Sequence, residues 1–229
     1  MNLGKLFVVA TPIGNLQDMT FRAIETLRQC PLIACEDRRV SLNLLRHFSI
    51  DATLIPYHNH NERMQTEYLL QKIDEGNSVA LICDAGTPTI SDPGFHLVRS
   101  CKQRGITVIP IPGACASTVA LSASGLPANR FLFVGFPGHK MSERRKLLEK
   151  YASFEGTLLC YESCHRVEKF LTDIAHVYGP DRTVSLCKEL TKIHETILTA
   201  PISDLLLRLQ TLSLRGEFVV LIAEQDYRL

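Results

Sequence analysis

The sequence predicts an α/β protein made of two unlike α/β domains, the first with a mostly parallel five-stranded sheet and the second with a mixed sheet. Short apolar runs alternate with helical patterns through the first half of the chain, which is typical of a parallel sheet covered on both faces. The run Pro110-Ile111-Pro112-Gly113 then interrupts this alternation. We therefore expect an N-terminal domain at residues 1–113 and a C-terminal domain at residues 114–229.

The first domain follows a regular order of strand and helix. Strands are expected at residues 5–10, 32–35, 53–57, 78–83 and 107–111. Helices are expected between them at residues 20–30, 40–48, 62–75 and 93–104. Asp18 or Thr20 can cap the first helix, and Gly76 can end the third. Pro93 suits the first turn of the fourth helix, where its missing N–H would have no partner.

The second domain begins with a helix at residues 114–124 and a turn at residues 125–127. Its strands are expected at residues 131–135, 157–161, 183–188, 195–200 and 217–223. Its later helices are expected at residues 142–153, 166–178 and 202–212. The strand at 195–200 follows its predecessor too closely for a crossover helix, so the sheet is expected to be mixed.

Composition narrows the function. The chain has 229 residues, of which 45% are hydrophobic and 21% charged, and its formal net charge is +1. This excludes a disordered chain and a strongly basic protein that coats nucleic acid, while it permits a local basic patch. No apolar run reaches the roughly 18 residues of a membrane span, and the run at residues 5–10 is too short for a signal peptide. We therefore expect a cytoplasmic protein without membrane contact.

The eight cysteines form no Cys-x-x-Cys pair. Several lie in apolar strand patterns, so we interpret them as free thiols in the core. A zinc site at Cys160, Cys164 and His165 is the alternative, but no second pair at ligand spacing accompanies it. His58 and His60 point to opposite sides of an extended chain. We expect no metal.

The loops that follow the strands carry the candidate chemistry, because ligands bind at the carboxyl ends of strands in parallel sheets. Pro12 and Gly14 predict a tight turn after the first strand, yet the turn matches neither a dinucleotide nor a P-loop motif. Four charged residues follow the second strand, either as a solvated helix start or as an ion-paired cluster at a site. They are Glu36, Asp37, Arg38 and Arg39.

Two further loops stand out. Residues 84–94 form a long loop of small residues, Pro, Gly and Asp, whose backbone could bind the polar edge of an adenosine or an amino-acid tail. The side chains of residues 161–166, Tyr-Glu-Ser-Cys-His-Arg, have two possible roles. They either provide hydrogen-bond partners for the start of the next helix, or they form an acid–base or anion-binding site. Residues 136–146 are locally basic beside an aromatic residue, which suits either phosphate contacts or a solvated helix face.

Taken in order, these segments resemble one family. The matching stretches are Val-Ala-Thr-Pro-Ile-Gly-Asn-Leu (9–16), Cys-Glu-Asp-Arg-Arg (35–39), Tyr-His-x-His-Asn-Glu (57–62), Asp-Ala-Gly-Thr-Pro-x-Ile-Ser-Asp-Pro-Gly (84–94), Pro-Ile-Pro-Gly (110–113), Leu-Ser-Ala-Ser-Gly-Leu-Pro (121–127), Tyr-Glu-Ser-x-His-Arg (161–166), Lys-Glu-Leu-Thr-Lys-x-His-Glu (188–195) and Gly-Glu-Phe-Val-Val (216–220). The chain resembles the tetrapyrrole methylase superfamily of S-adenosylmethionine-dependent methyltransferases. Within it, the chain is similar to the branch that methylates a cytidine 2′-hydroxyl of small-subunit (16S) ribosomal RNA.

The resemblance implies a homodimer that binds S-adenosylmethionine between its two domains and acts on the small ribosomal subunit. Together with the loops, it predicts the donor-binding residues Pro12, Gly14, Asp84, Ala85, Gly86, Thr87, Ile90, Cys115, Ala116, Tyr161 and Leu190. The family usually has Thr, Ser and Pro where this chain has Arg38, Cys115 and Cys164.

The expected reaction is an in-line methyl transfer, which depends on alignment and a water-poor site. A ribose hydroxyl is a poor nucleophile, so a general base would help. The candidates for the base are Glu36, Asp37, Glu162 and His165. The candidates for holding phosphates or orienting these acids are Arg38, Arg39, Lys140 and Arg166. The alternatives are methylation of a tetrapyrrole precursor or another small molecule, and a non-catalytic donor-binding module.

Overall fold

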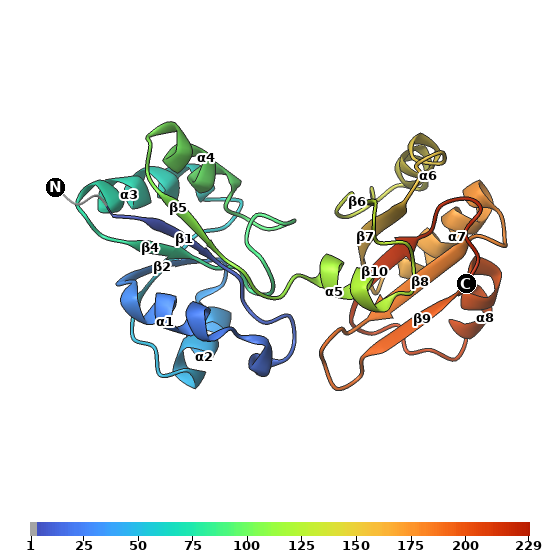
Figure 1. Cartoon of the computed structure of the whole chain (residues 1–229), viewed down its shortest axis with the longest axis horizontal. Coiled ribbons are helices and arrows are strands. Elements are labelled where there is room, and N and C mark those ends of the chain that lie inside the picture. The colour runs from blue at the N-terminus through green and yellow to red at the C-terminus, as the bar shows by residue number, and fades with distance from the viewer. Residues whose placement is uncertain (1–3) are drawn as a thin grey trace. The chain divides into compact units, whose positions relative to one another are not determined.

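The computed structural model describes residues 4–229. The chain divides into two compact units, residues 1–115 and residues 116–229, and each carries its own sheet (Figure 1).

The sheet of the first unit consists of five parallel strands. They are β1 (Leu6–Val9), β2 (Leu32–Cys35), β3 (Thr53–Pro56), β4 (Val79–Leu81) and β5 (Val108–Ile111). The strand order is β3-β2-β4-β1-β5, and every pairing is parallel. The predicted parallel sheet is confirmed.

Helices cover both faces of this sheet. They are α1 (Phe21–Gln29), α2 (Arg38–His47), α3 (Glu62–Asp74) and α4 (Phe95–Gln103). Figure 1 shows α1 and α2 on one face and α3 and α4 on the other. Ala80 of β4 packs into the core beneath α1 and α2, whereas its neighbours Val79 and Leu81 pack beneath α3 and α4. A strand buried on both faces in this way is continuously apolar, as the sequence of β4 is.

The sheet of the second unit is mixed, as predicted. Its strands are β6 (Phe131–Phe133), β7 (Thr157–Ser163), β8 (Thr183–Lys188), β9 (Thr196–Pro201) and β10 (Glu217–Ile222). Their order is β6-β7-β10-β8-β9, with only β6 and β7 parallel to each other as neighbours. Its helices are α5 (Ala116–Ala123), α6 (Met141–Lys150), α7 (Val167–Tyr178) and α8 (Ile202–Arg208). Its core includes Leu148 of α6, Phe170 of α7 and Leu205 of α8.

Several element ends differ from the prediction. Strand β7 continues to Ser163, because β10 pairs with it as far as that residue. Helix α4 begins at Phe95, so Pro93 precedes the N-cap residue Gly94 and does not lie in the first turn. Thr20 caps α1, and its side chain accepts a hydrogen bond from the Ala23 N–H at 3.1 Å. A short 3₁₀ helix η1 (Leu16–Asp18) was not predicted.

Two other features bear on the expectations. Six of the eight cysteines are buried, in agreement with their interpretation as core thiols. Within residues 4–229, no helix is both long and apolar enough to cross a membrane.

Candidate functional site

Two loops lie side by side at the carboxyl edge of the first sheet. Thr11, directly after β1, exchanges two backbone hydrogen bonds with Gly86 in the loop after β4, at 2.8 and 3.1 Å. The Thr11 hydroxyl also donates to the Cys83 carbonyl at 3.1 Å. Gly86 has φ +89°, a conformation that favours glycine. Pro12 and Gly14 therefore begin one loop and Ala85 to Ile90 the other, at a common edge.

Four carboxyl groups gather at the same edge: Glu36, Asp37, Asp84 and Asp92. Asp84 accepts a hydrogen bond from the Asp37 N–H at 3.0 Å. Burial, followed by the charge of Asp84, raises the pKa of Glu36. Burial, followed by the charge of Glu36, raises the pKa of Asp92 to about 7. Burial likewise raises the pKa of Asp84.

Asp37 differs from these three because it is an N-cap with its own cation. Its carboxylate accepts from the Arg39 backbone N–H at 2.8 Å and from the Arg39 guanidinium at 2.8 and 3.2 Å. These bonds with Arg39 lower the pKa of Asp37 to about 2. The charged segment is thus both a helix start and an ion pair. Arg38 occupies the first position of α2, beside them.

The long loop after β4 is held by residues from two other elements. Its end, Gly94, is the N-cap of α4 and has no side chain to cap the helix. Glu62 of α3 accepts from the Gly94 and His96 N–H groups at 3.0 and 3.3 Å. Tyr57 accepts from the Leu97 N–H at 3.2 Å and donates to Glu62 at 3.1 Å. These two buried side chains satisfy donors that the first turn of a helix leaves free.

The second unit has its own strand-end group. Strands β7 and β8 are both antiparallel to β10 and therefore run in the same direction, so Tyr161 and Leu190 lie toward the same edge. The Tyr161 hydroxyl accepts from the Ser117 N–H at 3.1 Å. The Leu190 side chain is buried, and its neighbours Glu189 and Thr191 have φ +50° and +64°.

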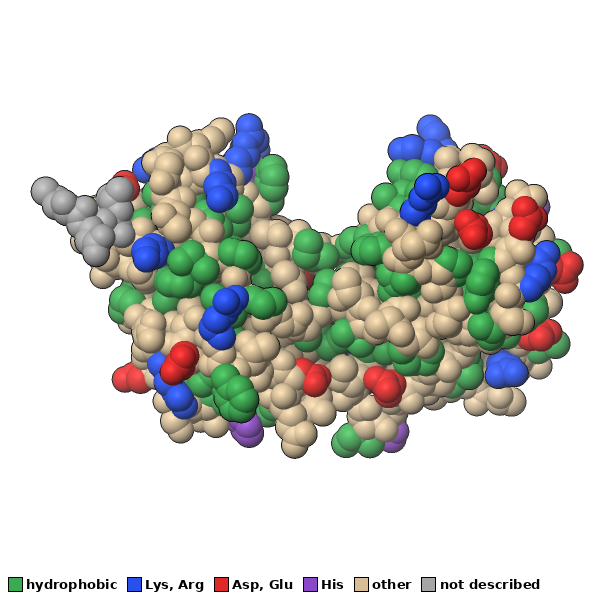
Figure 2. All heavy atoms as spheres, in the orientation of Figure 1, with side chains coloured by type: hydrophobic (Ala, Val, Ile, Leu, Met, Phe, Trp, Pro, Cys, Tyr) green, Lys and Arg blue, Asp and Glu red, His purple; other side chains and the backbone are tan. Residues whose placement is uncertain are grey.

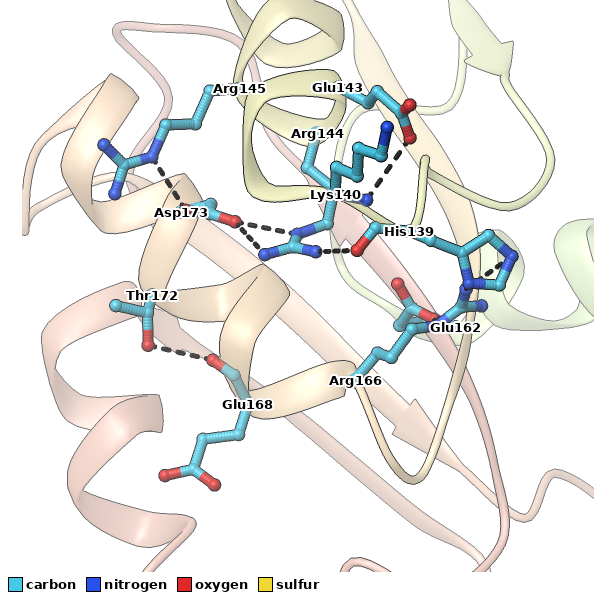
Figure 3. A network of polar contacts seen from close by, with 10 residues as sticks. All are labelled: His139, Lys140, Glu143, Arg144, Arg145, Glu162, Arg166, Glu168, Thr172 and Asp173. Carbon is cyan, nitrogen blue, oxygen red and sulfur yellow. Dashed lines mark hydrogen bonds and ion pairs between the residues drawn. The ribbon is translucent and has the colours of Figure 1, made fainter.

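A network of charged side chains joins α6, α7 and the end of β7 (Figure 3). Arg144 and Asp173 form a buried ion pair at 2.7 Å, and Arg145 binds the other oxygen of Asp173 at 2.8 Å. At the other end, Glu162 binds Arg166 at 2.9 Å. The Glu162 side chain is 0% exposed, and its second oxygen has no hydrogen-bond partner among the described residues.

His139 joins the two halves of this network. Its carbonyl accepts from Arg144 at 2.8 Å, and its ring lies 2.7 Å from Nη1 of Arg166. Because a guanidinium only donates, the ring nitrogen that faces it is an acceptor. Lys140 donates its backbone N–H to Glu143 at 3.2 Å. The residues before α6 are therefore tied to α7 and to β7.

Comparison with known proteins agrees with this architecture. The sequence pattern of the tetrapyrrole (corrin/porphyrin) methylases matches residues 5–206. The chain belongs to the tetrapyrrole methylase family.

This tetrapyrrole methylase is 51% identical over 203 residues to a protein of Escherichia coli O157:H7 named ribosomal RNA small subunit methyltransferase I, covering 89% of this chain and 71% of that one. It is 45% identical over 219 residues to a protein of the same name from Halalkalibacterium halodurans, covering 96% and 75% of the two chains.

Solved structures share the fold at lower identity. A diphthine synthase has a TM-score of 0.74 at 12% identity, over 96% of this chain and 90% of that one. A uroporphyrin-III C-methyltransferase from Thermus thermophilus has a TM-score of 0.64 at 18% identity, over 97% and 95% of the two chains. The predicted fold class is thereby confirmed.

The predicted site residues of this tetrapyrrole methylase fall into separate groups within each unit. The carboxyl edge of the first sheet carries Pro12, Gly14, Glu36, Asp37, Arg38, Arg39, Asp84, Ala85, Gly86, Thr87 and Ile90. The Thr87 hydroxyl donates to the Ala114 carbonyl at 3.0 Å, which ties this loop to the chain just before Cys115. In the second unit, Ala116 is the first residue of α5. Glu162 and Arg166 form an ion pair at the end of β7. His165 is exposed in the turn between β7 and α7.

The carboxyl edge of the first sheet suits a cationic ligand. Beyond the effect of burial, the charge of Asp84 raises the pKa of Glu36, and the charges of Glu36 and Asp84 raise the pKa of Asp92. A bound positive charge would relieve this repulsion. Within residues 4–229, no three His, Cys, Asp or Glu side chains are arranged to hold a metal ion.

The sequence does not predict two of the contacts that shape these sites. Glu62 makes the first, with the start of α4, and Arg144 makes the second, with Asp173. A signal for Glu62 exists, because Gly94 at the start of a helix offers no cap and an acceptor must come from elsewhere. For the pair of Arg144 with Asp173 we find no sequence signal, since the two residues are 29 positions apart.

Proposed function

We propose that this chain is an S-adenosylmethionine-dependent methyltransferase that acts on the 2′-hydroxyl of a cytidine ribose in small-subunit ribosomal RNA. The observation that carries the proposal is the 51% identity, over 89% of the chain, to a relative named for small-subunit ribosomal RNA methylation. The strand-end loops of both units support it, because they occupy the positions that a ligand of such a sheet takes.

The donor supplies an electrophilic methyl group on a positively charged sulfur. In the first unit, the loops at Pro12 and at Ala85 to Ile90 would hold it through backbone groups, and Asp84 and Asp92 would face its positive charges. In the second unit, Tyr161 and Leu190 are the proposed contacts, and Cys115 and Ala116 are proposed contacts at the point of the chain where the first unit ends and the second begins. Loops that are held in place before the donor arrives reduce the entropy lost on binding.

Glu36 is the general base that the surroundings favour. Its pKa is raised by burial and by Asp84, which brings it closer to the range in which a carboxylate accepts a proton effectively. Asp37 is bound to Arg39 with a pKa of about 2, and Glu162 is buried against Arg166. His165 is exposed in a turn. Asp37 and Glu162 are therefore better suited to orienting Arg39 and Arg166 than to accepting a proton.

Arg38, Arg39, Lys140 and Arg166 are the proposed contacts to RNA phosphates. Arg39 has 91% of its side chain exposed while its carboxylate partner holds it in one orientation. Phosphate contacts of this kind position a nucleic acid without reading its sequence. We further propose that the enzyme works as a homodimer in the cytoplasm, where its ribosomal acceptor is found.

The test is transfer of tritiated methyl from S-adenosylmethionine to small ribosomal subunits that lack native methylation, followed by mapping of the label. We expect label on one cytidine ribose. Asp84→Asn should weaken donor binding, and Asp51→Asn, which changes an exposed acid of the same unit, should not. Donor binding without any label on RNA would contradict the acceptor and would direct the next assay to uroporphyrin-like precursors. If the chain does not bind S-adenosylmethionine, the proposal that it is a methyltransferase is contradicted.

A further inference from the structure

We propose that His58 is a positioning residue for Glu36, which it keeps ionised among acidic neighbours and so able to accept the proton of the ribose hydroxyl. This role rests on the proposed function, in which Glu36 is the general base. During methyl transfer the ribose oxygen bonds to the methyl carbon, the carbon–sulfur bond breaks with its electron pair left on sulfur, and the hydroxyl proton passes to Glu36. His58 lies outside every group assigned so far, and it belongs to the same unit as Glu36.

The strand order places Glu36 between an acid and a histidine. Strand β2 has β3 as its neighbour on one side and β4 on the other. Glu36 directly follows β2, while His58 comes shortly after β3 and Asp84 shortly after β4. The Tyr57 N–H donates to the Cys35 carbonyl at 2.7 Å. The chains leaving β2 and β3 are therefore still paired one residue before Glu36 and His58, at the usual strand separation of about 4.8 Å.

Acidic groups surround Glu36 on the sides of β4 and α2. Those whose charges interact with it are Asp37, Cys83, Asp84 and Asp92. The backbone of Asp84 hydrogen-bonds to Glu36, yet the Asp84 charge raises the pKa of Glu36. A carboxyl group that keeps its proton cannot serve as a base. His58 acts in the opposite direction, because its positive charge lowers the pKa of Glu36.

The backbone of His58 is held in a fixed turn. Its N–H donates to the side-chain oxygen of Asn61 at 2.8 Å, and its carbonyl accepts from the N–H groups of Asn61 and Glu62, each at 2.9 Å. The Asn61 side chain also donates to the Pro56 carbonyl at 3.0 Å. These bonds tie His58 to the end of β3 and to the start of α3. Its ring therefore starts from a defined position next to the end of β2.

The ring of His58 is half-buried, and its Nδ1 atom is buried without a hydrogen-bond partner among residues 4–229. The ring meets the His60 ring edge-on, with the centroids 5.9 Å apart, a contact that uses neither ring nitrogen as a hydrogen-bonding atom. Buried polar atoms in folded proteins are nearly always bonded, so an unpaired one needs a reason. The charge interaction with Glu36 is a reason to keep a histidine at this position.

The general field of the protein does not replace this local charge. Figure 2 shows Lys, Arg, Asp and Glu side chains spread over the displayed face of the first unit, and the net charge of the whole chain is +1. Arg39, three positions after Glu36, already binds the carboxylate of Asp37 through two of its nitrogens. The ionisation of Glu36 therefore depends on its immediate neighbours, and the loss of His58 should be measurable.

The experiment titrates the side-chain carboxyl group of Glu36 in the full chain by ¹³C NMR, with its signal identified by its absence in Glu36→Gln. In His58→Gln the midpoint should move to higher pH by about 0.5–1 pH unit, because a positive charge is lost from a partly exposed pair. His58→Lys keeps a positive charge and should reverse most of this shift. His60→Gln, an exposed histidine of the same turn, is the matched control and should leave the midpoint unchanged.

The rate of methyl transfer gives a second measurement. In single-turnover methylation of small ribosomal subunits, the pH of half-maximal rate should rise in His58→Gln by the same amount as the midpoint of Glu36. It should stay unchanged in His60→Gln. The affinity for S-adenosylmethionine should be equal in all these proteins except Glu36→Gln, for which it is not compared. A purely structural role of His58 would lower the rate at every pH, and His58→Lys would not restore it.

Three results would overturn the role of His58 while the methyltransferase proposal stands. They are an unchanged midpoint of Glu36 in His58→Gln, an equal shift in His60→Gln, and a shifted midpoint without any change in the pH dependence of the rate. A loss of donor affinity in His58→Gln with an unchanged midpoint would assign the ring to the donor instead. The NMR titration needs no acceptor. If the wild-type chain binds the donor but methylates no rRNA, the proposed acceptor fails, while the titration still decides whether His58 controls the charge of Glu36.

Discussion

At the scale of single residues, two glutamates in strand-end positions have opposite surroundings. Glu162 is wholly buried and bound to Arg166, and one of its oxygens has no hydrogen-bond partner within residues 4–229. Glu36 is half-buried among other carboxyl groups and has a raised pKa. A buried carboxylate on an arginine orients that arginine, whereas a carboxylate with a raised pKa can accept a proton in the working range. Their sequence neighbours do not distinguish these roles.

Replacing Glu36 with Gln tests its role as the base. At saturating donor and RNA, the rate constant of methyl transfer should fall at least about 10²-fold, the smallest usual contribution of a general base. The wild-type rate should rise with pH through the raised pKa of Glu36, because only the ionised form accepts a proton. The variant should lose this rise. Single-turnover rates from mildly acidic to mildly alkaline pH measure both effects, and a variant with an unchanged rate would remove Glu36 from consideration.

Asp92 makes stability depend on pH. Its pKa is raised from 3.8 to about 7 in the folded state, so the folded chain binds a proton that the unfolded chain releases. The stabilisation by this proton is complete below the unfolded pKa and is lost as pH rises through about 7. Above pH of about 7, the free energy of unfolding of Asp92→Asn should therefore be larger than that of the wild type by roughly 1–2 kcal/mol, after allowance for solvent screening. Urea unfolding at several pH values measures this difference, which should vanish in acid.

At the scale of elements, the start of α4 depends on a neighbouring helix. Gly94 is required there because a Cβ would lie 2.7 Å from Leu81 and 2.9 Å from Thr89, and φ is +134°. Glycine leaves the helix without a side-chain cap, and Glu62 and Tyr57 supply the missing acceptors. The long loop before α4 is thus anchored by α3 and by the residue after β3.

Replacing Glu62 with Gln tests this anchor. The variant loses the negative charge at the helix N-terminus and one of its two carboxylate oxygens, so local stability should fall by about 1–3 kcal/mol. Amide hydrogen exchange at residues 94–97 should become faster, and donor affinity should decrease. Glu67→Gln is the matched control, because Glu67 lies on the same helix in an exposed pair with Arg104. Equal exchange in the two variants would contradict an anchoring role.

At the scale of the whole molecule, each unit has its own core and the net charge is small. A net charge of +1 cannot hold RNA by a general electrostatic field. RNA contacts must therefore come from a few cations at fixed positions, for which Arg38, Arg39, Lys140 and Arg166 are the proposed residues.

The dependence of RNA affinity on salt measures how many cations act. If all four meet phosphates of a single strand, the slope of log K against log salt should be about −3, and Arg166→Ala should reduce it by about 0.7. A titration across a series of salt concentrations gives both numbers. A slope twice as steep would show that further cations of the chain contribute.

Sequence alone determined much of the fold, because strands and helices are local. The alternation of apolar runs with helical patterns predicted the parallel sheet, and the short spacing between 183–188 and 195–200 predicted a mixed sheet in the second unit. Both are confirmed. The strand-end loops were also recognisable, since Gly, Pro and Asp mark irregular backbone without reference to any distant residue.

Which side chains meet depends on how the elements pack in three dimensions. Residues 32 positions apart make the anchor of α4, and residues 29 apart make the buried pair of Arg144 with Asp173. The same holds for β7, which is lengthened by its pairing with β10. The spacing of hydrophobic residues and the residue types that form turns are patterns within a few neighbouring positions. The partner of a buried charge depends instead on how whole helices and strands pack. That dependence is why the charged segments allowed two interpretations until the fold was known.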